Sequence, residues 1–466
     1  MNDEIGLIGL GPMGRGLAAA MQSHGIHVRA WEPSPEIRNS PEVTALGIAN
    51  ANGAEDLARG LKPNRIILLM VRSGTPVDDC LAALTPHLSP HDVVIDAGNS
   101  HPQDTERRQA LLHESGLALM GLGVSGGPSG ARRGPALMAG GPLDAWNRTG
   151  PVLKRIAARF NGEPCVDRFG AGAAGHYVKM VHNGIEYAVM QALADLHALL
   201  TQGCGLAANQ VGEIFARMEQ SPAAGFLTQI AAEAAAYPDP EGTGFLVDAV
   251  DDRAAQNGTG AWSVTAASEA GVAVPSIAAA VDFRTFSANA LFRRRAITKA
   301  ASAGGASLAV GDVGSLAASA MSAVSAASFQ QGLALLSHTG DRFGAPLPLC
   351  RIVRVWRAGS ILQGRMTEEL AQALQDESTP PDNPRTRYLD AVAAEGLDAL
   401  RQLTVFGISA GIPVPGLSTS LAYLDGFGDR PLSTRFVQML RDRFGEHGFR
   451  RLDGTLGHVP SLGNAS

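Results

Sequence analysis

Short, mainly apolar runs alternate with helical stretches along the N-terminal part of the chain. The runs that predict β-strands lie at 5–11, 27–32, 65–70, 92–98 and 117–124. A helix is expected at 13–23, directly after the first run, and further helical segments separate the later runs. Strands that alternate with helices predict a parallel sheet covered by helices on both faces, which is an α/β domain.

The pattern changes near residue 175. Strand signals almost disappear there, and Ala- and Leu-rich segments with helical spacing continue to about residue 425, interrupted by loops such as 237–244 and 377–386. The C-terminal residues are richer in Arg and Gly, which leaves little material for a separate core. We therefore expect an α/β domain over 1–174, a large all-helical domain over 175–430, and a tail over 431–466 that lies against another surface.

Composition narrows the possible functions. A chain of 466 residues is too long for one ordinary core, and its net charge of −6 argues against a general nucleic-acid binder. No apolar run approaches the roughly 18 residues of a membrane span, and the N-terminus lacks the pattern of a signal peptide, so the cytoplasm is the expected location. The four cysteines form no CxxC pair, and neither a metal site nor a disulfide framework is expected.

A glycine-rich turn joins the first predicted strand to the first predicted helix. Residues 9–14, GLGPMG, have the GxGxxG pattern, which lets the backbone and the helix N-terminus approach a pyrophosphate. Glu32 ends the second strand, where an acid binds the adenosine ribose and repels a 2′-phosphate. The pattern predicts NAD as cofactor and NADP as a weaker alternative, because Arg29 or Arg38 could in principle reach a phosphate.

Two further loops of this domain offer groups for a ligand. Residues 96–100 follow a strand at the carboxyl edge of the sheet, where α/β folds bind ligands. The glycine-dense segment 123–141 contains Ser125, Gly126 and Gly127, whose hydroxyl and backbone N–H groups suit a carboxylate or a carboxamide. A surface loop without function is the alternative for such a segment. Together with the glycine-rich turn, both loops are expected to face one crevice.

The stretch 175–187, GHYVKMVHNGIEY, opens the helical region. At helical spacing one face carries Lys179, His182, Asn183, Glu186 and Tyr187, while Val178, Val181 and Ile185 lie on another side. A lysine and a glutamate two turns apart could bind an anionic substrate and move its protons. An ordinary solvated helix face is the alternative, and the glycine loops that precede this stretch favour a site.

These motifs together resemble 6-phosphogluconate dehydrogenase, a family within the β-hydroxyacid dehydrogenase superfamily. They are GLGPMG, RIILLM, VVIDAGNS, GVSGGPSGARRGPALMAGG, GHYVKMVHNGIEY, GTGAWS, VWRAGSILQGR and RDRFGEH, from residue 6 to about 447. The resemblance implies a Rossmann-type domain, a helical domain for substrate binding and dimerisation, and a tail that enters the partner subunit of a homodimer. It also implies oxidative decarboxylation of 6-phosphogluconate in the pentose phosphate pathway.

The resemblance assigns roles to single residues. Lys179 would be the general base that takes the C3 hydroxyl proton, which requires a lowered pKa, and Glu186 would be the general acid. The substrate would be bound by Asn99, Ser125, Gly126, Gly127, His182, Asn183, Tyr187, Ser263 and Arg284, with Arg441 and His447 of the partner subunit. The cofactor would be bound by Gly9, Gly11, Pro12, Met13, Gly14, Glu32, Val71 and Asn99.

Three segments depart from the family pattern. Glu32-Pro33-Ser34 replaces the Asn-Arg-Ser/Thr of NADP-binding members, and HPQ follows Asn99-Ser100. Ala261 stands where GTGKW places a phosphate-contacting lysine, and Ser263 replaces threonine, so phosphate affinity is expected to be reduced unless an arginine among 293–295 compensates. A non-decarboxylating β-hydroxyacid dehydrogenase and a catalytically silent NAD-binding homologue remain alternatives.

Overall fold

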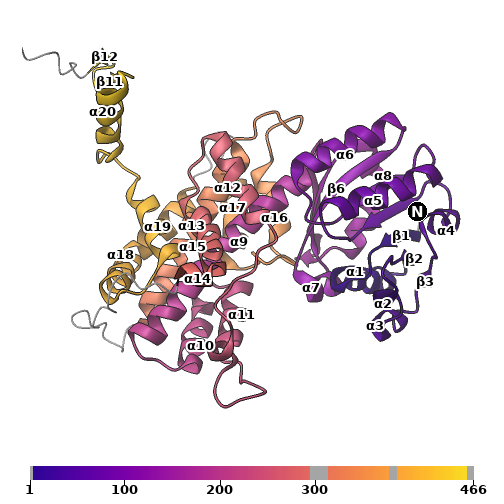
Figure 1. Cartoon of the computed structure of the whole chain (residues 1–466), viewed down its shortest axis with the longest axis horizontal. Coiled ribbons are helices and arrows are strands. Elements are labelled where there is room, and N and C mark those ends of the chain that lie inside the picture. The colour runs from indigo at the N-terminus through magenta and orange to yellow at the C-terminus, as the bar shows by residue number, and fades with distance from the viewer. Residues whose placement is uncertain (1–3, 294–312, 377–385, 459–466) are drawn as a thin grey trace, which may run out of the picture. The chain divides into compact units, whose positions relative to one another are not determined.

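The computed structural model describes residues 4–293, 313–376 and 386–458. The chain forms two compact units, residues 1–421 and 422–466. The first unit contains an eight-stranded sheet followed by a helical region, as the change of pattern near residue 175 predicts (Figure 1). The domain boundaries at residues 174 and 430 stay predictions, because the compact units divide the chain at a different place.

The sheet has the strand order β10-β7-β6-β5-β4-β1-β2-β3. Its strands are β1 (Glu4–Ile8), β2 (His27–Trp31), β3 (Ala49–Asn50), β4 (Ile66–Leu69), β5 (Val93–Asp96), β6 (Ala118–Ser125), β7 (Ala136–Gly140) and β10 (Val166–Gly170). All five predicted strands are present. The pairs β1–β2, β1–β4, β4–β5 and β5–β6 are parallel, as the alternation of strands and helices predicts.

One edge of the sheet departs from the prediction. β7 runs antiparallel to β6, so the expectation of a wholly parallel sheet is wrong here. The connection 126–135 holds only the short helix α7 (Gly127–Arg133), whereas a crossover to a parallel neighbour takes about a dozen residues or more. The antiparallel return places Ser125 at the carboxyl end of β6, with Gly126 and Gly127 at the start of the turn.

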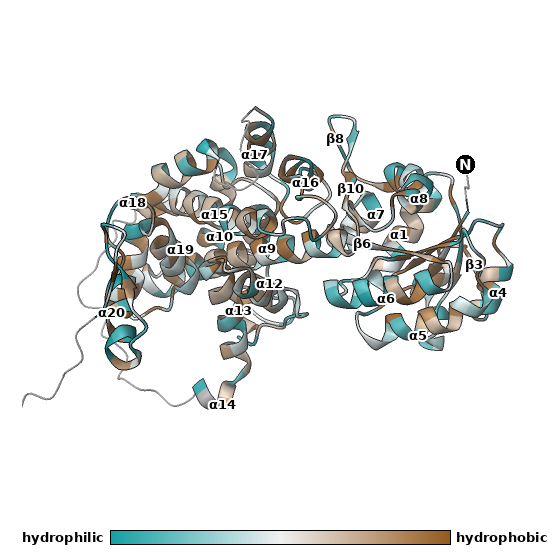
Figure 2. Cartoon of the chain, turned by 90° about the horizontal axis from the view of Figure 1, so that it is seen from above, coloured by the Kyte–Doolittle hydropathy of each residue, from teal (hydrophilic) through white to brown (hydrophobic). Residues whose placement is uncertain are grey.

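Alternate residues of the central strands enter two separate apolar cores. Leu7 of β1 belongs to the core shared with α1 (Pro12–Ser23) and α8 (Leu143–Ile156), whereas Ile8 belongs to the core shared with α4 (Ala54–Arg59) and α5 (Thr75–Leu84). Figure 2 shows hydrophobic strands between helices, and α6 (Pro102–Glu114) is largely hydrophilic on its outer side. Because both faces of the sheet are covered, its strands are continuous apolar runs.

Helix α9 (Ala174–Ala198) joins the sheet to the helical region. Its N-terminal part packs on β6, β7 and β10, and it also packs against α12 (Thr259–Ala270), α13 (Pro275–Ala288) and α15 (Val313–Ser337). Every residue of α9 from Ala174 to Ile185 is buried. The alternative of an ordinary solvated face is therefore wrong for this helix, because it is covered on all sides over these turns.

Seven more α-helices of the helical region are described. They are α10 (Ala208–Arg217), α11 (Phe226–Ala235), α14 (Ala290–Arg293), α16 (Leu349–Trp356), α17 (Arg365–Asp376), α18 (Arg387–Ala410) and α19 (Pro415–Asp425). Within the described residues, no helix is both long and apolar enough to cross a membrane.

The second compact unit is small. It contains α20 (Thr434–Gly445) and a hairpin of β11 (Phe449–Arg450) and β12 (Leu456–Gly457). Asp442 is the buried residue of α20, and its carboxylate accepts a hydrogen bond from the N–H of Gly448 at 2.6 Å. Phe436 and Phe444 are 68% and 77% exposed. This unit therefore leaves large apolar side chains of its helix uncovered, as expected of a tail without its own core.

Candidate active site and dinucleotide pocket

A pocket of about 590 Å³ lies at the carboxyl ends of β1, β2 and β4. Its lining includes Gly9, Gly11, Glu32 and Val71, four of the residues predicted to bind the cofactor. Gly9 has φ +95°, and a Cβ there would lie 2.4 Å from the carbonyl oxygen of Met70, so glycine is required for this turn. The location matches the ligand edge of a doubly wound sheet.

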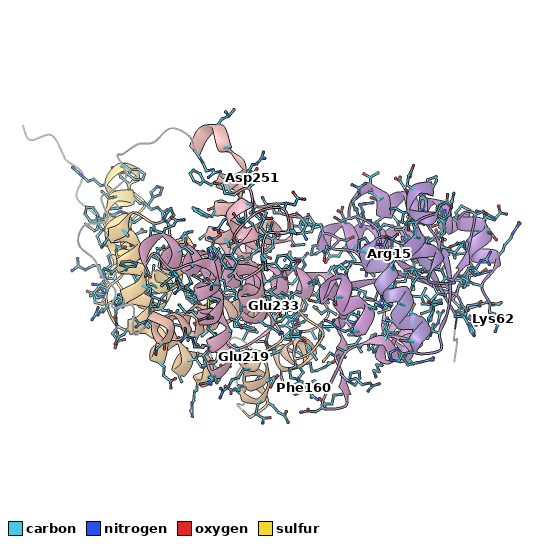
Figure 3. The ribbon with its side chains drawn as sticks, turned by 90° about the horizontal axis from the view of Figure 1, so that it is seen from below. Arg15, Lys62, Phe160, Glu219, Glu233 and Asp251 are labelled. Atoms are coloured by element: carbon cyan, nitrogen blue, oxygen red, sulfur yellow. The ribbon has the colours of Figure 1, made fainter. Side chains whose placement is uncertain are left out.

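Three more predicted cofactor residues belong to the same turn and helix start. Pro12 occupies the first turn of α1, Gly14 is buried in the same helix, and Met13 packs against the core beneath it. Arg15, labelled in Figure 3, donates a hydrogen bond from Nη1 to the carbonyl oxygen of Leu10 at 3.3 Å. The structure therefore brings the GLGPMG segment together as one helix start that faces the pocket.

Glu32 is 6% exposed, and its carboxylate connects two loops that line the pocket. Its Oε2 accepts a hydrogen bond from the N–H of Leu10 at 2.6 Å, and its Oε1 accepts one from the N–H of Ser34 at 2.9 Å. Each carboxylate oxygen has a second lone pair, which leaves acceptor capacity for the hydroxyls of a ribose. Leu10 and Ser34 belong to the two loops that follow β1 and β2, so Glu32 also fixes their relative position.

Both arginines considered for a 2′-phosphate have a partner in the structure. Arg29 forms an ion pair with Asp56 at 2.7 Å, and Nη1 of Arg38 donates to the backbone oxygen of Glu32 at 3.3 Å. Two other charged residues line the pocket and were not predicted from the sequence, Asp79 and Arg72. Arg72 could have been found from its place just after a strand of the sheet, whereas Asp79 lies in a helix and gives no such signal.

Lys179 lies on α9 where this helix crosses β6. A Cβ on Gly123 would lie 2.3 Å from Cβ of Lys179, so the glycine lets the two elements approach. The Lys179 side chain is 6% exposed, and its Nζ is 3.4 Å from Nδ1 of His182. Burial lowers the pKa of Lys179 to about 8, against the opposing effect of the Glu186 carboxylate. A lysine with this pKa is partly neutral at mildly alkaline pH.

His182 and Glu186 complete the ionisable cluster. Burial, followed by the nearby Lys179 cation, holds the pKa of His182 well below its usual value, so this imidazole is neutral at pH 7. The Glu186 side chain is 20% exposed, and its Oε2 is 3.8 Å from Nδ1 of His182. Burial raises the pKa of Glu186, while Lys179 and Arg284 lower it. The cluster thus combines a weakly basic amine with a carboxyl group that is easier to protonate than usual.

The carboxyl ends of β5 and β6 meet this cluster. Ser125 Oγ lies 3.2 Å from Nε2 of His182, and Asn183 donates from Nδ2 to Oγ1 of Thr259 at 3.0 Å. Asn99 is half-buried in the loop after β5, and the end of β5 itself contacts α9, since Nε2 of His176 is 3.0 Å from the backbone oxygen of Asp96. The predicted loops and the polar stripe of α9 therefore lie together in the first unit.

Tyr187 and Arg284 lie together at the other end of the polar stripe. The guanidinium carbon of Arg284 is 3.6 Å from the centre of the Tyr187 ring, and the Tyr187 hydroxyl donates to Oδ1 of Asn257 at 3.2 Å. Ala261 packs against the apolar cluster that contains Tyr187 and supplies no charge. Arg293 forms two hydrogen bonds with Asp252, and residues 294 and 295 lie outside the described residues.

The three other predicted substrate residues are Ser263, Arg441 and His447. Ser263 is fully buried, and its hydroxyl donates to the backbone oxygens of Met180 (2.8 Å) or Thr259 (3.0 Å), so it holds α12 against α9 and has no proton left for a phosphate. Arg441 lies on α20 and His447 follows that helix, so both belong to the second compact unit.

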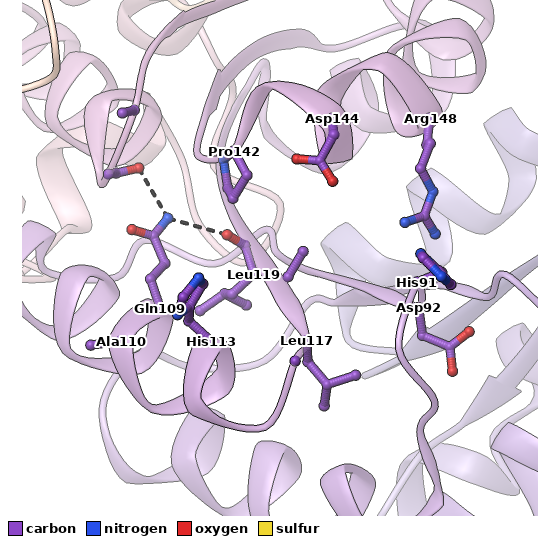
Figure 4. Close-up of a pocket in the computed structure, with 14 residues that line it drawn as sticks. His91, Asp92, Gln109, Ala110, His113, Leu117, Leu119, Pro142, Asp144 and Arg148 are labelled. Carbon is purple, nitrogen blue, oxygen red and sulfur yellow. Dashed lines mark hydrogen bonds between the residues drawn. The ribbon is translucent and has the colours of Figure 1, made fainter.

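A second pocket, of about 550 Å³, lies at the amino end of β6 (Figure 4). Gln109 of α6 crosses it, donating from Nε2 to the backbone oxygens of Leu119 (3.2 Å) and Gly172 (3.0 Å). His91, His113, Asp144 and Arg148 also line it, but none of the predicted site residues does. Because doubly wound folds bind ligands at the carboxyl edge of the sheet, we assign the candidate active site to the α9 cluster. The described residues contain no group of three or more His, Cys, Asp or Glu side chains arranged to hold a metal ion.

The sheet topology and the glycine-rich pocket define a Rossmann-type dinucleotide-binding protein with an added helical domain. Comparison with family models gives the same division: the NAD binding domain of 6-phosphogluconate dehydrogenase matches residues 4–170, and the 6-phosphogluconate dehydrogenase C-terminal domain matches residues 175–460. The chain belongs to the 6-phosphogluconate dehydrogenase family. The predicted family and fold class are thereby confirmed.

Individual relatives cover almost the whole chain. The decarboxylating 6-phosphogluconate dehydrogenase of Synechocystis sp. is 35% identical over 96% of this chain and 95% of its own length. The NADP(+)-dependent, decarboxylating enzyme of Bacillus subtilis is 33% identical over 97% of both chains. The solved 6-phosphogluconate dehydrogenase of Plasmodium falciparum, described in apo form and with NADP+ or 6-phosphogluconate, has a TM-score of 0.88 and 28% identity, and the match covers 98% of this chain and 100% of that chain.

Proposed function

We propose that this chain catalyses the oxidative decarboxylation of 6-phospho-D-gluconate to D-ribulose 5-phosphate and CO₂ with reduction of NAD. The observation that carries the proposal is the buried Lys179, whose pKa is about 8, beside the half-buried Glu186 on the same helix. The names of the relatives support the substrate and the decarboxylation, and the reaction is a step of the pentose phosphate pathway.

Neutral Lys179 would take the proton of the C3 hydroxyl, and NAD, held at the glycine-rich turn and Glu32, would supply the acceptor for the C3 hydride. The β-keto acid then loses CO₂, because the ketone accepts the electrons of the broken bond, and protonated Lys179 polarises that oxygen. Glu186 protonates C1 of the enediol. A pKa of about 8 for the base means that kcat/KM falls as pH decreases below 8, since the amine becomes protonated.

The substrate contacts follow from the same cluster. Asn99, the Ser125–Gly127 segment, His182 and Asn183 bind the carboxylate and hydroxyls in this proposal. Tyr187 and Arg284 bind the phosphate, together with Arg441 and His447 of the partner subunit in a homodimer. Paired arginines suit phosphate geometrically, and they become more important here because Ala261 supplies no amino group.

The reaction is tested by measuring the amounts of carbon dioxide and NADH that are formed in the same assay. Equal amounts support decarboxylation, whereas NADH formation without CO₂ would favour a non-decarboxylating β-hydroxyacid dehydrogenase. Tight NAD binding without turnover of any phosphorylated aldonic acid would favour a catalytically silent homologue. Gluconate, assayed beside 6-phosphogluconate, measures how far the phosphate contributes to kcat/KM despite Ala261.

We further propose that NAD is preferred over NADP. Glu32 is a buried acid at the pocket, where a 2′-phosphate would meet its charge, and Arg29 is paired with Asp56. Steady-state kinetics should give a higher kcat/KM with NAD, and Glu32→Gln should raise the NADP/NAD ratio by roughly tenfold because a neutral amide no longer repels the phosphate. The control is Glu36→Gln on α2 (Pro35–Arg38), a fully exposed acid. A wild-type preference for NADP would refute the proposal.

A further inference from the structure

His182 lies in the middle of a chain of hydrogen bonds that runs from β6 to Lys179. Its Nε2 is 3.2 Å from Oγ of Ser125, and its Nδ1 is 3.2 Å from Oδ1 of Asn183 and 3.4 Å from Nζ of Lys179. A neutral imidazole carries one proton, so one ring nitrogen donates and the other accepts. Which nitrogen carries the proton determines whether Lys179 faces an N–H group or a lone pair.

The groups around Asn183 decide the partner of Nδ1. The backbone N–H of Thr259, which can only donate, points to Oδ1 of Asn257 at 3.3 Å, and the Thr259 hydroxyl donates to the same oxygen at 2.7 Å. Oγ1 of Thr259 therefore has no proton left and accepts the hydrogen bond from Nδ2 of Asn183. This orientation turns Oδ1 of Asn183, an acceptor, toward Nδ1 of His182.

The groups around Ser125 agree with this assignment. The backbone N–H of Ile361, again a donor only, points to Oγ of Ser125 at 3.2 Å. The proton of the Ser125 hydroxyl is therefore free to be donated to Nε2 of His182, which accepts it when the ring proton lies on Nδ1. Asn183 thus places the ring proton on Nδ1, and Ser125 offers the matching donor to Nε2.

We propose that Ser125 is a positioning residue that, with Asn183, holds His182 as its Nδ1–H tautomer, so that His182 presents an N–H group to the Nζ of Lys179. The proposal rests on the proposed role of Lys179 as general base. It assigns the Ser125 hydroxyl to His182 and leaves the backbone of Gly126 and Gly127 for the substrate carboxylate.

This tautomer favours a neutral Lys179. A neutral amine can share the Nδ1 proton with Oδ1 of Asn183, whereas an ammonium group, which has no lone pair, finds no acceptor on the ring. The charged groups that act on this cluster are Glu186, which raises the pKa of Lys179, and Arg284 of α13, which acts on Glu186. From β6 and α16, the groups facing His182 are the uncharged Ser125 and Trp356.

The helical region holds this arrangement in place through the segment 356–364. The ring of Trp356 meets the ring of His182 edge to face at 5.5 Å, which restricts rotation of the imidazole. The N–H of Ala136, at the start of β7, donates to the backbone oxygen of Gly359 at 2.8 Å. Ile361 is therefore anchored two residues after a backbone contact with the sheet. This gives the VWRAGSILQGR segment a role in orienting the site.

The tautomer can be measured directly in the wild-type protein. A two-dimensional ¹⁵N–¹H spectrum of histidine-labelled protein distinguishes the protonated from the unprotonated ring nitrogen, and the His182 signals are those missing in His182→Gln. Protonated Nδ1 and unprotonated Nε2 at pH 7 are expected. A protonated Nε2 would overturn the proposal. This measurement needs no turnover, so it stands even if the proposed reaction fails.

A pH profile tests the effect on Lys179. In Ser125→Ala the acidic limb of kcat/KM should move up by roughly half a pH unit or more, because Nδ1–H becomes a weaker donor when Nε2 loses its partner. Ser125→Thr keeps a hydroxyl and should restore the wild-type profile. A reduced rate with an unshifted profile in Ser125→Ala would show a merely structural or substrate-binding role and refute the proposal.

Thr105→Ala is the matched control. Thr105 Oγ1 is 2.7 Å from Nδ1 of His176, which lies one turn before Lys179 on α9. This variant also removes a hydroxyl from a buried histidine of the same helix, but it leaves the chain from Ser125 to Lys179 intact. Its acidic limb should stay at the wild-type pH. An equal shift in Thr105→Ala would mean that any loss of packing against α9 moves the profile, and would count against the proposal.

Discussion

The amine of Lys179 is buried between β6 and the following turn of α9, and burial lowers its pKa from 10.5 to about 8. Its partner Glu186 is shifted in the opposite direction by the same cause, since burial disfavours the charged form of each group. At the scale of single residues, the environment therefore brings an acid and a base closer to neutral pH than either is in water. Such a shift costs stability in the free protein.

Lys179→Met should stabilise the protein while it removes activity. Unfolded lysine keeps a pKa near 10.5, so the stability associated with neutral Lys179 is present above pH 10.5 and is lost as pH falls toward 8. At pH 7 the folded state buries a disfavoured ammonium group, and an apolar side chain should raise the free energy of unfolding by about 2–3 kcal/mol. Urea denaturation at pH 7 measures the difference.

The exposed Lys62 supplies the control for this prediction (Figure 3). Lys62→Met should leave both the free energy of unfolding and the turnover near their wild-type values. If the free energy of unfolding of Lys179→Met equals that of the wild type or is lower, burial of the Lys179 ammonium group does not destabilise the folded protein. Near-normal turnover of the same variant would remove Lys179 from the mechanism.

At the scale of elements, α9 carries the residues proposed to transfer protons and also packs on the sheet that forms the dinucleotide pocket. The contact depends on Gly123 of β6, which leaves the space that Cβ of Lys179 occupies. The packing of α9 on β6 therefore fixes the position of Lys179 relative to the carboxyl edge of the sheet. The place of a helix residue in the sequence alone does not fix that position, because it depends on a strand more than fifty residues earlier.

Gly123→Ala should disturb both stability and activity. The new Cβ would lie 2.3 Å from Cβ of Lys179, so β6 and α9 must separate, at a cost of about 1–3 kcal/mol in the free energy of unfolding. Thermal unfolding and kcat together measure the effect, and kcat should fall because Lys179 moves. Gly53→Ala, in extended backbone with open space around its Cβ, should leave kcat unchanged and lower the free energy of unfolding only by the change at the N-cap of α4. Wild-type thermal stability and kcat in Gly123→Ala would show that β6 and α9 are not in close contact at this position.

At the scale of the whole molecule, the chain consists of a large unit with the α9 cluster and a small C-terminal unit with Arg441 and His447. Phe436 and Phe444 of the small unit are exposed, although large apolar side chains on one short helix are usually covered in the functional assembly. This arrangement is consistent with the proposed homodimer, in which the tail of one subunit completes the active site of the other.

Complementation of two inactive variants tests the exchange of tails. Lys179→Ala subunits keep an intact Arg441, and Arg441→Ala subunits keep an intact Lys179. If the tail acts on the partner, a mixed dimer has one complete site, and random reassociation should restore about a quarter of the wild-type activity. Each variant reassociated with itself is the control and should stay inactive. No recovery in mixed dimers, verified by two different affinity tags, would place the tail in its own subunit's site.

The sequence was sufficient to predict the elements that depend on local pattern. Buried strands such as β4 and β5 are continuous apolar runs, and the glycine-rich turn lies between a strand and a helix, so both are visible without tertiary information. The polar stripe of α9 follows from helical spacing alone. The roles of these residues remain proposals, but their common location in the structure agrees with the sequence pattern.

Contacts between distant segments required the tertiary structure. The direction of β7, the turn of the Ser263 hydroxyl toward Met180, and the pairing of Arg29 with Asp56 are fixed by packing between elements. Side-chain period and composition carry no information about such contacts.

The sequence by itself therefore determined the family and the order of the two kinds of domain, and it supplied the residues proposed to carry the chemistry, because each depends on spacing along the chain. The tertiary structure decided the chemical state of those residues. It buried Lys179, and it brought the N–H of Ile361 to Ser125 across 236 positions of sequence. The physical reason is that pKa and tautomer depend on desolvation and on the donors within about 3.5 Å, which folding supplies from segments far apart in the chain.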